Sequence, residues 1–138
     1  MRIIGFNLSK ISIQRKEILE DNLHATQNID IKDIISLKLP VSEEDALKIT
    51  FNFKIEYSKE AANLDFLGYV FVQAKKEERD KILKSWKKEE KEIPEEIRMS
   101  LFNFIMNKCN IKAISLEDEM NLPLHIPMPQ IASKPSEE

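Results

Sequence analysis

Two histidines and one cysteine are the side chains in this sequence best suited to bind a metal or to act as a base or nucleophile. His24 and His125 are widely separated, and neither belongs to a spacing that could supply the three or four ligands of a zinc site. Cys109 has no second cysteine to pair with, so its ordinary role is a small buried side chain on a helix. We therefore predict no catalytic residue, no metal site and no cofactor. An enzymatic role for His125 would require a polar cleft around it, and a structural or solvent-facing role is the alternative that we favour.

Carboxylates occur in adjacent groups, which general acid–base catalysis could use. These groups are Glu43-Glu44, Glu95-Glu96 and Glu117-Asp118-Glu119. Paired carboxylates do such chemistry when an apolar pocket separates their pKa values, and the sequence shows no such pocket. The second and third groups lie at expected helix starts, where acidic side chains favour the helix dipole. We therefore predict that these two groups cap helices.

The composition sets further limits on function. The 138 residues predict one domain over residues 1–131, followed by a polar, disordered tail over 132–138. A net charge of −3 argues against binding to nucleic-acid phosphates, which usually shows as a basic surface. No apolar stretch approaches the ~18 residues that a membrane span needs, no signal peptide is visible, and a lone cysteine suits a reducing compartment. We expect a cytoplasmic protein that neither inserts into membranes nor binds nucleic acid.

Period-two hydrophobicity predicts a β-hairpin in the middle of the chain. From Leu47 to Tyr57 apolar residues alternate with polar ones, which is typical of a strand with one buried face. From Leu64 to Ala74 apolar residues occupy both faces, as in a central strand or in one that contacts a partner. The isolated Gly68 predicts a bulge or a close approach of another backbone.

Two weaker strands are predicted in the N-terminal third. In residues 4–13 the apolar phase changes near Ser9 and Lys10, which requires a bulge or a kink. In residues 29–39 the apolar residues at odd positions are expected to share one face: Ile29, Ile31, Ile35, Leu37 and Leu39. Pro40 then ends the strand, because proline cannot donate a hydrogen bond to a sheet.

Helical patterns follow the hairpin. Residues 75–92 are highly charged with a narrow apolar stripe, which predicts a surface helix anchored by Trp86. Pro94 begins a second, largely apolar helix that we expect to stop at Asn110, and Ser115 is expected to cap a short third helix. Strands followed by helices predict an α+β fold, with a four-stranded antiparallel sheet and helices packed on one face.

The apolar residues exceed what one small sheet needs. Residues 121–131 read NLPLHIPMPQI, in which three prolines exclude helix and favour an extended ribbon. Surplus apolar surface usually serves self-association or partner binding. We predict binding residues on the odd face of the second hairpin strand and on the ribbon: Leu67, Tyr69, Phe71, Leu122, Leu124, Ile126 and Met128. The ribbon has an alternative role as a strap that covers the core from outside, and we favour the strap.

The order of these elements resembles the SecB-like superfamily of protein-export chaperones. FNLSKISI in residues 6–13 is similar to the first strand of that family, and NLPLHIPMPQI to the proline-rich connection beside its last helix. The resemblance covers residues 1–131 and extends to small archaeal proteins with a comparable ribbon. It implies a four-stranded sheet with helices on one side and assembly into dimers or tetramers. The family's Cys-Pro and Leu-Phe-Pro-Tyr-type signature is absent, since the corresponding segment reads KEIPEEIRMSLFNFI, so no functional residue is carried over.

Two functions therefore remain open. The first is a non-catalytic, chaperone-like module that binds extended apolar segments of a polypeptide or protein partner, through strand-edge hydrogen bonds and apolar pockets. The second is a structural or assembly protein whose apolar surplus is buried in its own interface. Both functions predict a homo-oligomer.

Overall fold

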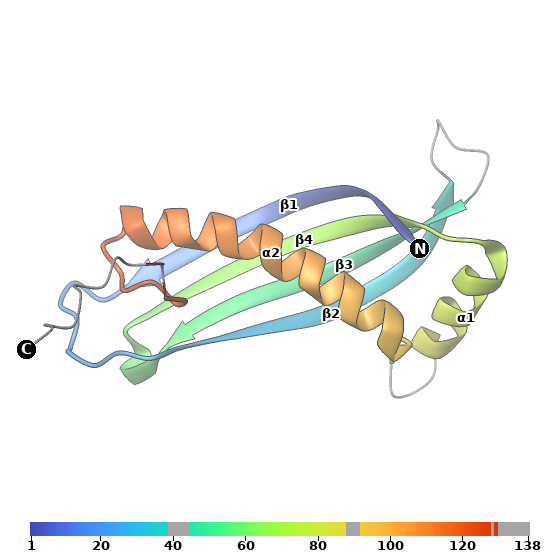
Figure 1. The fold of residues 1–138 in the computed structure, drawn as a ribbon. Coiled ribbons are helices and arrows are strands. Elements are labelled where there is room, and N and C mark those ends of the chain that lie inside the picture. Colours follow the sequence, from blue (N-terminus) through green and yellow to red (C-terminus); the bar gives the residue numbers. More distant parts are fainter. Residues whose placement is uncertain (39–44, 88–91, 128, 130–138) are drawn as a thin grey trace, which may run out of the picture.

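One antiparallel sheet and two helices make up the computed structural model, which describes residues 1–38, 45–87, 92–127 and 129. The elements follow in the order β1 (Arg2–Arg15), β2 (Ala25–Lys38), β3 (Asp45–Tyr57), a 3-10 turn η1 (Ser58–Glu60), β4 (Ala62–Gln73), α1 (Lys76–Lys87) and α2 (Glu95–Glu119). The strand order is β1-β4-β3-β2, so β1 and β2 are the edges of the sheet. In Figure 1, α2 crosses one face of the sheet and α1 lies at one end of it. The predicted α+β fold is confirmed.

The core lies between α2 and the side of the sheet that faces it. Alternate residues of β3 point into this core and are fully buried: Leu47, Ile49, Phe51, Phe53 and Ile55. Every fourth residue of α2 meets them and is also fully buried: Leu101, Ile105, Cys109 and Ala113. A period of two in a strand and a spacing of four in a helix each keep side chains on one face. The two apolar faces therefore pack directly on one another. Among the described residues, no helix is both long enough and apolar enough to cross a membrane.

Register shifts set the phase of the edge strands, and the first of them lies between Ile3 and Gly5 in β1. In β1 the register with β4 shifts between Leu8 and Lys10, where the sequence predicted a change of phase. In β2 the register with β3 shifts between Ile31 and Asp33, which the sequence did not reveal. The bulge turns Ile34 into the core and leaves Ile35 44% exposed, so the expectation that Ile35 shares a face with Ile31 is wrong. A single extra residue exchanges the two faces of a strand.

α2 is longer than predicted. It continues through Asn110 and Ser115 to Glu119, so the stop and the third helix expected from these residues are absent. The reason is the buried stripe, which carries on at the same spacing past Asn110 to Ala113 and Glu117. Tertiary packing along the whole helix outweighs a weak local stop signal.

Gly68 has no room for a side chain. A Cβ at this position would lie 2.5 Å from the backbone oxygen of Asn7 and 2.8 Å from the ring of Phe51, which confirms the predicted close approach. We expect Gly68→Ala to lower the free energy of unfolding by about 1–3 kcal/mol, because the neighbouring strand or the core must shift.

Gly5→Ala is the matched control, because the three atoms nearest to its Cβ would belong to the Phe71 side chain, the closest at 3.1 Å, and a side chain can move more easily than a strand. Urea unfolding of both variants measures the difference. Equal losses for the two glycines would contradict the assignment of the Gly68 contact to backbone.

Candidate functional site

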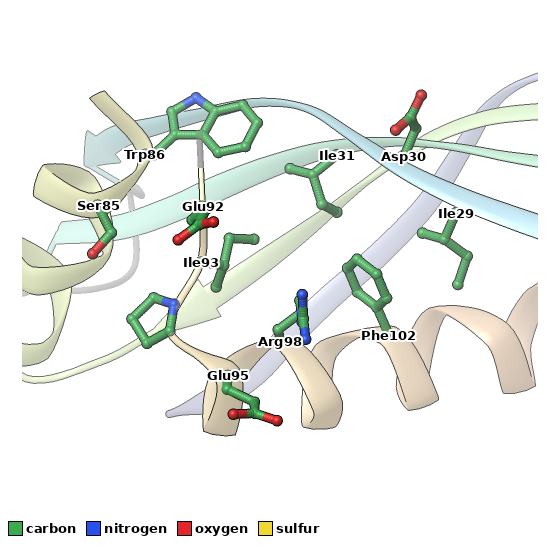
Figure 2. A pocket seen from close by; sticks show the side chains of 11 residues that line it. Ile29, Asp30, Ile31, Ser85, Trp86, Glu92, Ile93, Glu95, Arg98 and Phe102 are labelled. Atoms are coloured by element: carbon green, nitrogen blue, oxygen red, sulfur yellow. The ribbon is translucent and has the colours of Figure 1, made fainter. Parts of the chain in front are cut away.

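A groove of about 710 Å³ lies where β2, the end of α1 and the start of α2 meet (Figure 2). Its apolar lining comes from all three elements and from the segment between the helices: Ile29, Ile31, Trp86, Ile93, Pro94 and Phe102. Its charged lining consists of Asp30, Glu92, Glu95 and Arg98. The groove is therefore a concave surface on which apolar side chains alternate with polar and charged ones.

Core contacts fix the helical walls of the groove. Ile82 anchors α1 because it is fully buried, and Trp86 lies one turn further along the same helix. Ile93 is buried just before α2, and Pro94 has an extended backbone that marks the helix start. The Arg98 amide then donates to the Pro94 carbonyl at 2.9 Å, which closes the first turn. The positions of the two helical walls are therefore fixed by their contacts with the core.

The remaining wall is an edge strand. Among the described strands β2 pairs only with β3, so the backbone groups on its outer side have no sheet partner. Ile29 and Ile31 are half-buried and pack against the core, so the groove lies alongside the middle of β2. An edge strand with free N–H and C=O groups is a template on which an extended chain can add.

The predicted binding residues of β4 lie on the other side of the sheet. Leu67, Tyr69 and Phe71 occupy the face away from α2, since the even positions of β4 are the buried ones. All three are half-buried, the Tyr69 and Phe71 rings meet edge to face at 5.3 Å, and the Lys48 ammonium lies 4.7 Å from the Tyr69 ring centroid. These residues form an apolar stripe on the sheet face away from α2, which also carries the exposed Ile35 of β2.

The predicted binding residues of the ribbon lie on the α2 side. Leu122 is buried in the core, and Leu124 and Ile126 are half-buried. Met128 lies outside the described residues. The ribbon and the β4 stripe are therefore on opposite faces of the sheet and do not line one groove. Whether either set binds a partner stays a prediction.

A buried polar cluster ties the ribbon to α2 and β3. The two side chains of its central pair, His125 and Glu117, are 2% and 0% exposed, and Nδ1 of the histidine lies 2.7 Å from Oε1 and 2.9 Å from Oε2 of the glutamate. On the other side of the ring, Nε2 lies 2.8 Å from the side-chain oxygen of Asn110. Both ring nitrogens of His125 therefore have a polar partner, and the histidine and Glu117 form a buried, hydrogen-bonded pair.

Tyr57 and Arg15 complete the attachment of the ribbon. The Tyr57 hydroxyl is 2.9 Å from Glu117 Oε2 and also within hydrogen-bond distance of the Pro123 carbonyl. Burial first, and then the hydrogen bond and charge of the Glu117 carboxylate, raise the pKa of Tyr57 above its usual value. The Arg15 guanidinium of β1 donates to the Met120 carbonyl at 2.8 Å, at the end of α2. These bonds hold the ribbon against α2 and β3, as expected for a strap that covers the core from outside.

The cluster corrects the predicted role of Glu117. The sequence placed this residue at a helix start, but it lies in the last turn of α2 and is one of the most deeply buried side chains. The usable signal was its spacing of four from Ala113 and eight from Cys109, which puts it on the buried face. His125 is enclosed rather than set in an open cleft. Among the described residues, no group of three or more His, Cys, Asp and Glu side chains is arranged to hold a metal.

Comparison with known proteins identifies a similarity of fold. No protein-family model matches the chain, and no curated protein matches it. Among solved structures, the fold is similar to that of a SecB-like chaperone from Mycobacterium tuberculosis, determined in complex with a ChAD peptide from the HigA1 antitoxin. The two chains are 14% identical, and the alignment covers 97% of this chain and 91% of the other with a TM-score of 0.49. At this level of identity the similarity concerns the fold alone.

Proposed function

We propose that this protein is a non-catalytic, chaperone-like module that binds an extended apolar segment of another polypeptide in the groove beside β2. The observation that carries the proposal is the coincidence of a strand edge without a sheet partner among the described strands and a hollow alongside it whose lining includes large apolar side chains. A segment that added to β2 would gain backbone hydrogen bonds whatever its sequence. Because side chains alternate along a strand, every second one would enter the hollow against Ile29, Ile31 and Phe102.

The β4 stripe is a second proposed contact surface. Leu67, Tyr69 and Phe71 would bury their exposed parts either against a partner or against another copy of the chain, which would then be a dimer or a tetramer in the cytoplasm. Half-exposed aromatic side chains side by side on a sheet face favour such a contact. For the ribbon we propose the strap, because the His125 and Glu117 side chains that attach it to α2 are buried. Self-association through the β4 stripe, with no client, is the alternative function.

The single tryptophan of the chain makes the groove directly observable. Trp86 lines the groove, so occupancy by an extended apolar peptide is expected to shift its fluorescence in a saturable way. A polar peptide of the same length is the control. Calorimetry with the same apolar peptide separates the alternatives. No heat and no shift would refute the proposal, and heat without a shift would move the binding surface away from the groove.

Charge substitutions on β2 test the position of the site. Ile31→Lys places a charge in the groove and is expected to weaken the binding of the apolar peptide by about tenfold. Ile35→Lys is the matched control on the same strand. Ile35 is exposed, and it lies beside Lys48 on the face of the sheet away from the groove. Circular dichroism checks that both variants fold. Equal affinities for the two variants would show that the groove is not the binding surface.

A further inference from the structure

Among the described residues that line the groove, Arg98 is the one with a positively charged side chain. Within the part of the chain that the structure describes, its guanidinium makes no hydrogen bond and no ion pair. In Figure 2 its side chain rises from α2 between Ile93 and Phe102, whereas the Glu95 carboxylate points the other way. The neighbouring arginine on α1, Arg79, is by contrast bonded to the carbonyls of Asp45 and Ala74.

Helix stability does not explain this arginine. Arg98 lies four positions into α2, near the positive end of the helix dipole, where a cation is disfavoured and an acid is preferred. Its fork of N–H donors fits a carboxylate in two-point geometry, and flanking apolar side chains strengthen such a contact by excluding water. The groove therefore holds a recognition group for a carboxylate beside an apolar surface.

We propose that Arg98 makes the groove selective for extended segments that carry one acidic side chain among large apolar residues. This inference rests on the proposed function. The carboxylate is assigned to an internal Asp or Glu rather than to a chain end, because the groove lies at the middle of β2 and an added strand continues past it in both directions. The Asp30 carboxylate is paired with Lys32 at 3.2 Å, which leaves Glu92 on the rim to repel further acids, so a single acid is bound better than several.

A charge-exchange experiment tests the inference. Two peptides that differ only by Glu or Gln at the central position are titrated against the full chain, with Trp86 fluorescence as the signal. The Glu peptide is expected to bind about tenfold more tightly at low salt, and less so as salt screens the contact. Arg98→Gln abolishes the difference, and Arg98→Glu reverses the choice in favour of a Lys peptide. Arg98→Lys keeps the charge without the fork and gives an intermediate preference.

Arg2→Gln is the matched control, because it removes the same charge from an exposed arginine that bonds to Gln73 on β4. It is expected to leave the preference intact. If both peptides bind the wild type equally, or if Arg2→Gln removes the preference as Arg98→Gln does, the inference is overturned while the proposed function stands. If neither peptide binds, both fail. A peptide with a free carboxyl end at the central position that binds as tightly as the Glu peptide overturns the assignment to a side chain.

Discussion

Replacement of Glu117 by alanine is expected to lower the free energy of unfolding by about 3–5 kcal/mol, because two buried side chains lose their acceptor and each such loss costs about 1–3 kcal/mol. The side chain is fully buried and accepts from His125 and Tyr57, so its removal leaves the imidazole and the phenol without their acceptor. It also frees the ribbon, because the His125 amide bonds to the same carboxylate at 3.2 Å. Chemical denaturation followed by circular dichroism measures the loss.

Three further variants separate the pair from the helix end. Glu119→Ala removes an exposed carboxylate two residues away and is expected to change stability by no more than about 0.5 kcal/mol. Glu117→Gln keeps an acceptor for the ring and should cost less than the alanine variant. Replacement of both Glu117 and His125 by leucine should recover much of the loss, because an apolar pair leaves no buried charge. A loss below about 1 kcal/mol for Glu117→Ala would mean that water reaches the cluster in solution.

The strap and the groove lie at opposite ends of α2. Arg98 is in its first turns and Glu117 in its last, and the buried stripe from Leu101 to Ala113 joins the two ends. A helix held along its whole length by the sheet gives the groove a rigid wall. The ribbon therefore contributes to the proposed site by holding the far end of that wall in place, without contacting the groove.

The fold was predictable because the apolar residues of each buried face recur in the sequence at a short, regular spacing. Leu47 to Tyr57 alternate so regularly that only one strand phase buries the apolar set, and the residues that follow could only form its hairpin partner. The β1 bulge was visible for the same reason, since two phases of isoleucine occur in one strand. The β2 bulge was not visible, because Ile34 and Ile35 are adjacent and either one could face the core.

The groove could not be predicted because no local pattern connects its parts. Ile29 and Ile31, Trp86, and Arg98 belong to three elements, and only the packing of α1 and α2 against β2 brings them together. The polar cluster was missed for a similar reason. In the sequence Glu117 resembles an ordinary surface acid. Only the fold shows that it lies on the buried face of α2, next to Tyr57 and His125.

Alkaline pH is expected to destabilise the protein through Cys109. The thiol is fully buried on α2, and burial raises its pKa from 9.0 to about 12. Between these two values the unfolded chain has lost the thiol proton while the folded chain retains it, so unfolding releases a proton. The free energy of unfolding therefore falls as the pH rises through this window, by at most about 1.4 kcal/mol per pH unit. The raised pKa of Tyr57 acts in the same direction.

Cys109→Ala isolates the contribution of the thiol. The substitution removes the titrating group, so its stability should fall less steeply with pH than that of the wild type, whatever constant loss the smaller side chain causes. Every other ionisable group, Tyr57 included, is present in both proteins, so its contribution cancels in the difference. Denaturation curves at intervals between pH 8 and about pH 11, a range in which ordinary thiols ionise, give this difference directly. Parallel stability profiles would show that the thiol ionises in the folded state, which would require α2 to open locally from the sheet.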